Sequence, residues 1–558
     1  MNMFQTQHWL LRRVRPWAAT LAVAAFTMAC ATPGHEVPRP PSQAIDNPHE
    51  TALGRSFASQ LASTPGLSGF RLLPAGQEAF LVRAALAEAA QRTLDLQYHI
   101  VASDATGTAL LYRALRAAQR GVRVRLLIDD LDVGDRDADL AAVAAHANVQ
   151  VRVFNPFSTR SAAGLSRVLD YLSVGARLNR RMHNKLWIAD NAAALIGGRN
   201  LGDAYFSADG QSNFADLDVL AVGPVVVEAS RSFDEFWNSR WSVPIQAFTG
   251  APPGPEQFEQ AFAEMTARVA AFRDTDYVRE LLASGLGQRV RSGQIELIAA
   301  PATVLHDSPD KLVARTTDQD EHVVARLRQA IEEAQHELVL VTPYFVPSEL
   351  GIETLCRLAR RGVPVRVLTN SLASTDVAAV HAGYARYRPR LLACGVALHE
   401  LRPSVTGSGR LHRVLSSQRR AAPELTHPLG GRTTYTVGLG ALSSGVSLHA
   451  KAIMVDRSAV LIGSMNLDPR SRLSNTEIAV RVESEALGRE LGTWFDEATS
   501  LDRSFKVELS VAGREQAPLV WIGRDGDQPV RYTSEPLASW WQRFISGLLG
   551  AFVPESLL

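Results

Sequence analysis

One short motif occurs twice in this chain, and this repeat restricts the fold more than any other feature. Each copy reads His-x-Lys, then Asp five positions later, then a Gly-x-x-Asn turn. The members are His183, Lys185, Asp190 and Asn200 in the first copy, and His449, Lys451, Asp456 and Asn466 in the second. Every member is offset by 266 residues, as are four apolar positions around the motif. We therefore expect two related halves that each supply part of one active site.

A second block recurs upstream of each motif copy. Residues 118–127 and 359–368 both read as a helix that ends at Gly, followed by a short apolar strand. Another apolar strand precedes each block, at 93–100 and at 337–344. Strands that alternate with helices indicate an α/β fold in which helices cover a largely buried sheet.

The length of 558 residues exceeds one ordinary domain, so two halves with connecting segments are expected. A stretch rich in Pro and Gly at 244–255 marks a boundary, and helical periodicity follows it. The predicted segments are a signal at 1–30, a Pro-rich tether at 31–65, a first half at 66–245, a helical connector at 246–317, a second half at 318–510 and a tail at 511–558.

The N-terminus has the features of an export signal. Three Arg residues within 12–15 precede an uncharged stretch at 17–29, which is short for a membrane span. The stretch ends at Ala29-Cys30, which resembles a bacterial lipoprotein cleavage site with Cys30 as the lipidated residue. An uncleaved signal anchor is the alternative. Both place the catalytic domain in the cell envelope outside the cytoplasm, at either the inner or the outer membrane.

Charge and cysteine content exclude several classes of protein. The net charge of +1 provides no basic field for nucleic acid, so no nucleic-acid partner is expected. Three Cys residues form neither a disulfide framework nor a zinc-binding spacing. We expect Cys356 and Cys394 to be small buried apolar residues.

The C-terminal tail carries an apolar stripe at helical spacing. Its members are Leu537, Trp540, Trp541, Phe544, Ile545 and Leu548. Adjacent Trp residues on such a stripe are typical of helices at a membrane interface. The alternative is that the stripe packs back onto the domain.

The paired His-x-Lys motif fits the chemistry of a phosphodiester. Residues i and i+2 of a strand project from one face, so His183 and Lys185 point together, as do His449 and Lys451. Two strands facing across a pseudo-twofold axis bring two His and two Lys to one small volume. The two Lys residues, with Asn200 and Asn466 as neutral donors, can hold the growing negative charge of a phosphoryl transition state.

In such a site, one neutral His can attack phosphorus while the other, protonated, gives a proton to the leaving alkoxide. No carboxylate cluster and no Cys/His ligand spacing accompanies the motifs, so neither a metal nor a cofactor is expected. A non-catalytic module would have lost a His or a Lys, and both copies are complete.

Both motif copies resemble the signature of the phospholipase D superfamily, over roughly residues 70–510. The resemblance implies a covalent phosphohistidine intermediate and two phospholipase D-like α/β halves around a pseudo-twofold axis, with the active site at their interface. It implies that Asp190 and Asp456 are chiefly structural. It also implies an acidic residue some thirty positions after each His that orients an imidazole, matched here by Asp216 and Glu477. Asp218 stays open as an alternative to Asp216.

Further segments are similar to bacterial cardiolipin synthases, most of all their C branch. They include 342–347, 368–376, 381–384, 464–471 and the tail around 535–541. This similarity implies transfer of a phosphatidyl group through His to phosphatidylglycerol, with phosphatidylethanolamine or a second phosphatidylglycerol as donor. The enzyme would be membrane-associated. Ser464 is a further phosphate-binding candidate, on one side only, because the first copy has Gly198 there.

Two hydrolytic functions remain as alternatives: a phospholipase D that releases phosphatidate, and a nuclease of the same superfamily. Family precedent favours His183 as the nucleophile. Residues that either line the pocket or belong to the core are Tyr98, His99, Asp104, Tyr344, Asp376 and His381. His399 is expected to be structural.

Overall fold

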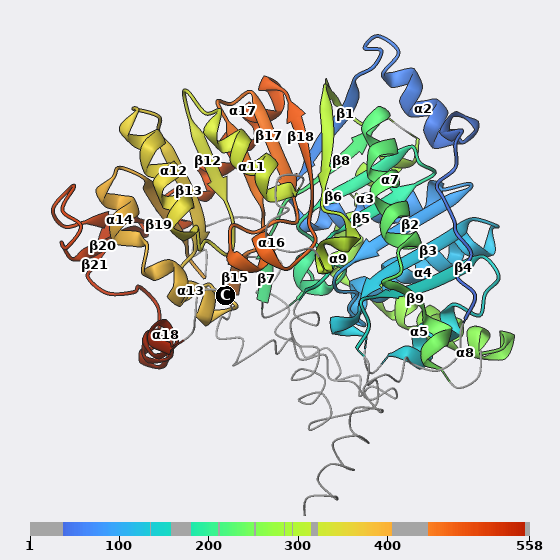
Figure 1. Ribbon diagram of the computed structural model, residues 1–558. Helices are drawn as coiled ribbons and strands as arrows, with labels where there is room; N and C mark the ends of the chain where they lie inside the picture. Colours follow the sequence, from blue (N-terminus) through green and yellow to red (C-terminus); the bar gives the residue numbers. More distant parts are fainter. Residues whose placement is uncertain are drawn as a thin grey trace, which may run out of the picture.

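The computed structural model describes residues 37–133, 136–157, 180–209, 212–249, 253–283, 285–292, 294–313, 322–403 and 445–552. The predicted signal segment and Cys30 lie outside these residues. Two large sheets stand side by side, one for each half of the chain (Figure 1).

The first half forms a nine-stranded sheet in the order β10-β1-β8-β6-β5-β2-β3-β4-β9. The strands β2, β3 and β4 are parallel, and every other neighbouring pair is antiparallel. Their bounds are β1 Ser68–Leu73, β2 Thr93–Tyr98, β3 Arg123–Asp129, β4 Val149–Phe154, β5 Leu186–Ala189, β6 Ala193–Gly197, β8 Asp218–Val222, β9 Ser242–Pro244 and β10 Ile298–Ala300.

The second half repeats this order and these directions in the series β11-β18-β17-β16-β12-β13-β14-β19, which β20 and β21 extend to ten strands. The predicted fold class of two homologous α/β halves is thus confirmed. The bounds are β11 Ala302–His306, β12 Leu338–Val341, β13 Val365–Asn370, β14 Ala397–Leu401, β16 Ala452–Val455, β17 Ala459–Gly463, β18 Ile478–Glu483, β19 Ser504–Leu509, β20 Leu519–Asp525 and β21 Gln528–Tyr532.

Alternation along the central strands sends apolar residues to both faces of each sheet. In β12, Leu338 and Leu340 pack with the outer helices, whereas Val339 and Val341 face the other half. The outer helices are α3 Gly76–Ala89, α4 Ala105–Gln119 and α5 Asp137–Val143 on the first half, and α11 Val323–Glu332, α12 Ser348–Arg360, α13 Ala378–Ala385 and α14 Arg388–Ala393 on the second.

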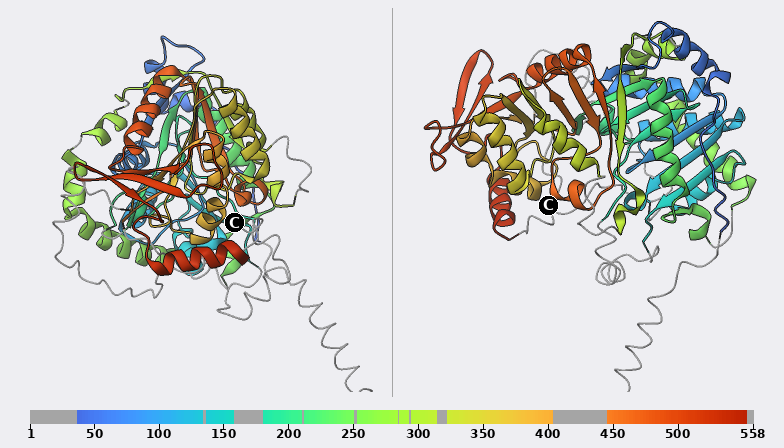
Figure 2. Two further views of the ribbon diagram at one scale, coloured as in Figure 1. Left: turned by 90° about the vertical axis from the view of Figure 1, so that its left-hand side faces the viewer. Right: turned by 45° about the horizontal axis from the view of Figure 1, so that its top comes forward.

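A shared core fills the space between the two sheets. It includes side chains from both sheets and from two helices, α7 Pro224–Asn238 and α17 Glu485–Ala498. The helix α7 contacts β11 of the other half, and α17 contacts β1. The halves therefore form one continuous body (Figure 2).

A two-stranded parallel ladder crosses between the halves, formed by β7 Ser212–Ala215 and β15 Gly445–Leu448. The connector forms α8 Pro255–Arg273, α9 Asp276–Ala283 and α10 Leu286–Arg291, which pack on the first half. The second sheet starts at β11, ahead of the boundary predicted at 318, because β10 and β11 are separated by Pro301 alone and pair with different sheets.

Short helices complete the described elements: η1 Pro48–Glu50, α2 Ala52–Gln60, η2 Asp130–Asp132, η3 Asp203–Tyr205, η4 Ile245–Phe248, η5 Pro309–Leu312 and α16 Pro469–Leu473. The tail ends in α18 Trp540–Phe552. Within the described residues, none of the helices combines the length and apolarity needed to span a bilayer.

The segment predicted as a tether packs on the first half instead, as far as it is described. Arg125 donates to the carbonyl oxygen of Ser42 (2.8 Å), and Arg152 donates to that of Pro40 (2.8 Å). Both guanidinium groups are almost entirely buried, and a buried charge requires acceptors. The backbone of the Pro-rich segment supplies them, which composition alone did not indicate.

The prediction for the two internal cysteines was wrong. Cys356 in α12 and Cys394 at the end of α14 form a disulfide, with Cα atoms 5.4 Å apart. The two residues are separated by 38 positions in the sequence. Only the packing of α12 against α14 brings them within bonding distance.

Candidate active site

Each motif His is held by the backbone of the opposite half. The amide of His183, just before β5, donates to the carbonyl oxygen of Thr476 (2.9 Å). The amide of His449, just after β15, donates to that of Ala215 (2.8 Å). A side-chain hydrogen bond from Thr476 Oγ1 to Asn184 Oδ1 (2.9 Å) adds to the first contact. The two motif copies therefore meet at the interface between the halves.

The two orienting carboxylates are exchanged between the halves. His183 Nδ1 lies 2.9 Å from Glu477 Oε2, and His449 Nδ1 lies 2.6 Å from Asp216 Oδ2. With a proton on Nδ1, each ring donates to its carboxylate and leaves Nε2 free. The sequence indicated both carboxylates, but not that each serves the His of the other half.

The two Lys residues lie beside the His residues, but the motif residues lie in the segments before β5 and β16 rather than on the strands that the sequence had predicted. Lys185 Nζ donates to the carbonyl oxygen of His183 (2.6 Å), and Lys451 does the same to His449. Lys451 Nζ also lies 2.9 Å from His449 Nδ1. Both ammonium groups are buried, so their charge is poorly screened by water.

Burial and mutual repulsion lower the pKa of every basic group in this cluster. Burial lowers the pKa of Lys185 to about 7, that of Lys451 to about 8 and that of His449 to about 4. Burial and the two Lys residues lower the pKa of His183 well below its usual value. A bound anion would raise the pKa of all four groups, because it stabilises their protonated forms.

The two carboxylates respond differently to the same surroundings. Burial raises the pKa of Glu477 to about 6. Burial acts in the same direction on Asp216, but His449 and Lys451 outweigh it and lower the pKa of Asp216 on balance. Asp216 is therefore the more firmly ionised partner, which favours an imidazolium at His449 over one at His183.

The Asn residues of the motif lie in the same region. Asn200 donates through Nδ2 to Tyr205 Oη (2.9 Å) and accepts from the amide of Ile100 (3.2 Å), which leaves one amide hydrogen. Asn466 is buried, and its Oδ1 has no hydrogen-bond partner within the described residues. Both side chains keep hydrogen-bonding capacity for a ligand.

The predicted phosphate-binding role does not fit Ser464. Its hydroxyl donates to Glu477 Oε2 and accepts from the amide of Ile478 (3.0 Å), so its single hydrogen is used. Ser464 instead positions the carboxylate that orients His183. The first half has Gly198 here because an added Cβ would lie 2.2 Å from Asp216 Oδ1.

The signature Asp residues lie in the β5–β6 and β16–β17 turns, next to the starts of β2 and β12. Asp190 accepts the backbone amides of residues 91, 92 and 93, with distances of 2.7 to 2.9 Å. Asp456 accepts those of residues 335, 336 and 337. Both have a positive φ, 54° and 53°, in equivalent turns. This geometry matches the structural role that the resemblance implied.

Asp218 can be set aside as an orienting residue. Its carboxylate forms a salt bridge with Arg83 (2.9 Å) and lies 3.4 Å from Arg199. All three side chains are buried. Asp216 is the residue that reaches a motif His.

Among the flanking candidates, His99 lies nearest to the motif. Its ring lies 5.3 Å from that of His183, and its Nδ1 lies 3.1 Å from the carbonyl oxygen of Met182. Tyr344 donates to Asp376 Oδ2 (2.8 Å). The charge of Lys451 lowers the pKa of that carboxyl, against the larger raising effect of burial. These three residues belong to the surroundings of the site.

The other flanking candidates are structural. Tyr98 is fully buried and accepts from Arg83 Nε (3.1 Å), while Asp104 caps α4. His399 packs its ring against Phe495. His381 is buried, with one ring nitrogen within 4.8 Å of a carboxylate oxygen of each of two Glu residues that Arg388 bridges.

Three residues around the motif were not singled out from the sequence. The rings of Tyr205 and Phe214 lie 5.2 Å and 5.0 Å from that of His449. The charge of Arg470, in α16, lowers the pKa of His183. Arg470 forms no salt bridge with another residue in the described part of the chain. Arg470 stands four positions after Asn466, and that proximity to the motif was the available signal.

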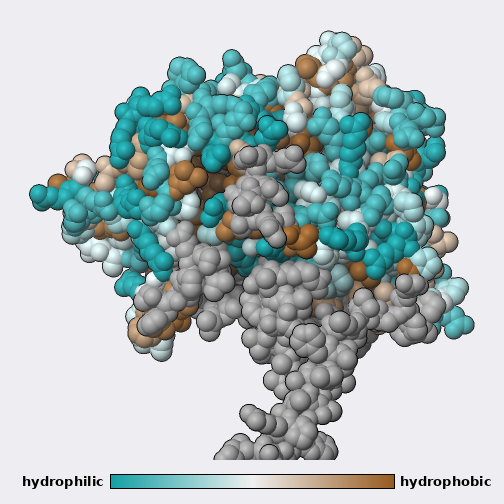
Figure 3. Space-filling view, in the orientation of Figure 1, coloured by the Kyte–Doolittle hydropathy of each residue, from teal (hydrophilic) through white to brown (hydrophobic). Residues whose placement is uncertain are grey.

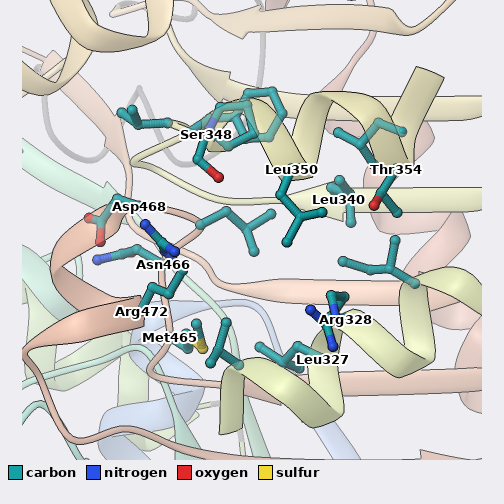
Figure 4. Close-up of a pocket in the computed structure, with 18 of the residues that line it drawn as sticks. Leu327, Arg328, Leu340, Ser348, Leu350, Thr354, Met465, Asn466, Asp468 and Arg472 are labelled. Carbon is teal, nitrogen blue, oxygen red and sulfur yellow. The ribbon is translucent and has the colours of Figure 1, made fainter. Parts of the chain in front are cut away.

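An apolar cavity of about 210 Å³ opens beside Asn466 (Figure 4). It lies between α11, α12 and the loop 465–468. Apolar side chains such as Leu327, Leu340 and Met465 form its walls, and Arg328 and Arg472 also line it. An apolar chain thus has a place next to the motif.

Comparison with known proteins decides the family. A family model described as "Cardiolipin synthase, PLD-like domain" matches residues 83–237 and 327–499, one range in each half. The chain belongs to this family. It is therefore an enzyme of the phospholipase D type, as the sequence predicted.

Individual relatives cover nearly the whole chain. Cardiolipin synthase C of Escherichia coli (strain K12) is 36% identical over 501 residues, which cover 88% of this chain and 97% of the relative. Cardiolipin synthase A of Edwardsiella ictaluri (strain 93-146) is 22% identical over 471 residues, which cover 84% of this chain and 71% of the relative. Among solved structures, the phosphatidylserine synthase of Haemophilus influenzae Rd KW20 aligns with a TM-score of 0.52 at 12% identity, covering 90% of this chain and all of that chain. This last likeness supports the fold.

Proposed function

We propose that this enzyme is a cardiolipin synthase-like phosphatidyltransferase that moves a phosphatidyl group from a donor phospholipid to phosphatidylglycerol. The observation that carries the proposal is the pair of complete His-Lys motifs joined by exchanged carboxylates at one interface. The family membership and the near full-length similarity to a cardiolipin synthase support the substrate class.

In the first step, His183 Nε2 attacks the phosphorus atom of the donor. A P–N bond forms, the P–O bond to the headgroup alcohol breaks, and His449 gives its Nε2 proton to the leaving alkoxide. His183 is assigned as nucleophile because burial raises the pKa of its partner Glu477, so this carboxylate stabilises an imidazolium less than Asp216 does. His449 is assigned as the acid because ionised Asp216 stabilises its imidazolium.

In the second step, a hydroxyl of phosphatidylglycerol gives its proton to His449 and attacks phosphorus. The P–N bond breaks, and His183 is released as neutral imidazole. Lys185, Lys451, Asn200, Asn466 and Arg470 surround the site and stabilise charge on the non-bridging oxygens.

Transfer requires that a lipid alcohol outcompetes water at the phosphohistidine. The apolar cavity beside Asn466 supports a lipid substrate, because an acyl chain would fill it and exclude water there. A phospholipase D that releases phosphatidate would use the same residues, and it is the alternative. The net charge of +1 favours neither alternative but offers no attraction for a nucleic acid.

Product analysis by mass spectrometry tests the assignment directly. Purified full-length protein is added to vesicles of phosphatidylethanolamine and phosphatidylglycerol, and each lipid is then omitted in turn. Cardiolipin as product would support the transferase and identify the donor. Phosphatidate without cardiolipin would move the assignment to hydrolysis, and neither product would refute both.

We expect kcat to depend on pH in a bell shape, because the bound substrate anion raises the pKa of His449 from about 4 in the free enzyme and keeps it protonated. The limbs should lie at or above the free-enzyme values, which are about 6 for Glu477 and about 7 to 8 for the two Lys residues. Glu477, with a pKa of about 6, must be ionised to orient His183, so activity rises as pH passes that value. Lys185 and Lys451, with pKa values of about 7 and 8, must be protonated, so activity falls above them.

The substitution Lys185→Arg tests the alkaline limb. A guanidinium stays protonated to far higher pH, so the limb should move up to the value set by Lys451. The measurement is kcat against pH on a short-chain soluble substrate. An alkaline limb that does not move would remove Lys185 from the proposed titration.

We further propose that the catalytic body lies outside the cytoplasm, attached to a membrane. The disulfide between Cys356 and Cys394 supports this, because such bonds persist in the bacterial periplasm and are rare in the cytosol. The predicted export signal at 1–30 is consistent with that location. Attachment through lipidated Cys30 or through an uncleaved anchor remains part of the proposal.

Thiol trapping in cells tests the proposed location. Cells are quenched in acid, and the denatured protein is treated with a maleimide of high mass, with or without prior reduction. We expect Cys356 and Cys394 to react only after reduction. The control is Cys356→Ser, which leaves Cys394 as a free thiol. This variant should therefore be labelled without reductant. Two reactive thiols in the unreduced wild type would contradict an oxidising location.

A further inference from the structure

The C-terminal helix α18 is packed the opposite way round from an ordinary surface helix. Its large apolar side chains face away from the protein, with 63% of Trp540, 54% of Trp541 and 55% of Phe544 exposed. The most buried side chains of the helix are polar, with Gln542 and Ser546 only 7% and 9% exposed, while Ile545 and Leu549 are half-buried. We call the exposed set the outward face; it consists of Leu537, Trp540, Trp541, Phe544 and Leu548.

Several contacts fix this orientation. Gly550 packs against Ala382 of α13, with an added Cβ only 3.7 Å from the Ala382 methyl group. Arg386 donates to the carbonyl oxygen of Gly550, near the end of α18. Ahead of the helix, Glu535 forms a salt bridge with buried Arg388. The small residues on the inner side permit close packing, so the helix does not need its apolar side for contact with the protein.

The outward face is unusual within the described residues. It contributes five of the ten large apolar residues that are exposed there, and all of the aromatic ones. The rings of Trp540 and Trp541 stack at 4.1 Å, and Phe544 lies 5.9 Å from Trp541. In Figure 3 this patch appears as hydrophobic colouring at the lower left, where Figure 1 shows α18. A contiguous exposed patch of this kind marks an interaction surface.

We infer that the outward face of α18 inserts into the interfacial region of a phospholipid bilayer and holds the active site against the membrane; this inference rests on the proposed function. Tryptophan is enriched at membrane interfaces, because its ring is apolar and its N–H is polar. The helix contains no acidic residue; it carries the exposed Arg543, and the exposed Arg386 of the neighbouring segment contacts it. Their charges complement an anionic lipid such as phosphatidylglycerol.

The position of α18 connects membrane contact to the site. The helix rests on α13, which starts two residues after Asp376. Asp376 accepts a hydrogen bond from Tyr344, and the charge of Lys451 lowers its pKa. Ala538 packs with Leu372 and Ala373 in the loop before α13. Figure 1 shows α18 at the same lower side as the β7–β15 ladder, which holds the backbone of His449. Insertion of α18 would therefore bring this side of the site to the lipid headgroups.

Fluorescence quenching tests the insertion with the full-length protein. The protein is bound to vesicles of phosphatidylethanolamine and phosphatidylglycerol that contain phospholipids brominated near the headgroup end of the acyl chains. We expect quenching of the wild type and loss of that component in Trp540→Phe/Trp541→Phe, which keeps the outward face apolar. The control Trp241→Phe removes a half-buried Trp elsewhere and should leave the quenched component in place.

A second measurement asks whether insertion serves catalysis. In Trp540→Ser/Trp541→Ser/Phe544→Ser, the ratio of activity on vesicles to activity on a short-chain monomeric phospholipid should fall at least about ten-fold. Quenching that is equal in the wild type and the Phe variant, or an unchanged ratio, would overturn the inference. A wild-type dimer that the Ser variant converts to a monomer would also overturn it, and would assign the face to a second copy. Absence of transfer by the wild type on both substrates would refute the proposed function, while the quenching would still decide the inserted face.

Discussion

Alanine at either motif His is expected to reduce turnover on natural lipids by about 10⁴-fold or more, because nucleophile and acid act as one unit. His183→Ala removes the Nε2 that would form the P–N bond. His449→Ala removes the proton donor for the leaving alkoxide and the acceptor for the incoming hydroxyl. Each ring is held in place by a carboxylate of the opposite half, so neither His can replace the other.

The leaving group separates the two roles. The nitrophenolate of a nitrophenyl phosphodiester departs without protonation, so on this substrate His449→Ala should regain formation of the covalent intermediate, whereas His183→Ala should stay inactive. The measurement is the burst of nitrophenol in rapid mixing, together with detection of phosphohistidine. Rescue of His183→Ala instead would exchange the two roles. Near-wild-type turnover by either variant on natural lipids would contradict the shared site.

Removing the charge of an orienting carboxylate is expected to have the second largest effect. Asp216→Asn and Glu477→Gln keep the size of each side chain, but an amide no longer stabilises an imidazolium or holds the required tautomer. We expect kcat to fall about 10³- to 10⁴-fold, equivalent to about 4 to 5.5 kcal/mol of transition-state stabilisation. In Asp216→Asn the loss falls on the acid, His449, so the nitrophenyl substrate should recover part of it.

Asp190→Asn provides the matched control. Its carboxylate accepts three backbone amides and reaches neither His, so the change should lower the thermal stability and have a far smaller effect on kcat. Thermal unfolding and kcat, measured on the same preparations, separate the two outcomes. If Asp216→Asn lowered stability as much as Asp190→Asn and left kcat intact, Asp216 would be structural.

The predictions that the structure contradicts concern residues whose role depends on a partner far away along the chain. Ser464 stands in the motif and has the chemistry of a phosphate ligand, but its hydroxyl is occupied by Glu477. Cys356 and Cys394 have no recognisable spacing, and only helix packing joins them. The segment predicted as a tether, 31–65, is rich in Pro, but buried Arg side chains bind the backbone of Pro40 and Ser42 within it. In each case the deciding atom lies far away along the chain.

The sequence by itself determined the duplication, the α/β class and the grouping of His with Lys. The first two follow from the repeated motif and from apolar strands that alternate with helices. His and Lys do lie together, although the motif residues precede β5 and β16 and do not lie on a strand, where the sequence had predicted them. Only the tertiary structure decided that each carboxylate serves the opposite His and that α18 turns its Trp residues outward. These features depend on which surfaces meet when the two halves pack. A linear pattern records the chemistry of each side chain, but not which neighbour satisfies it.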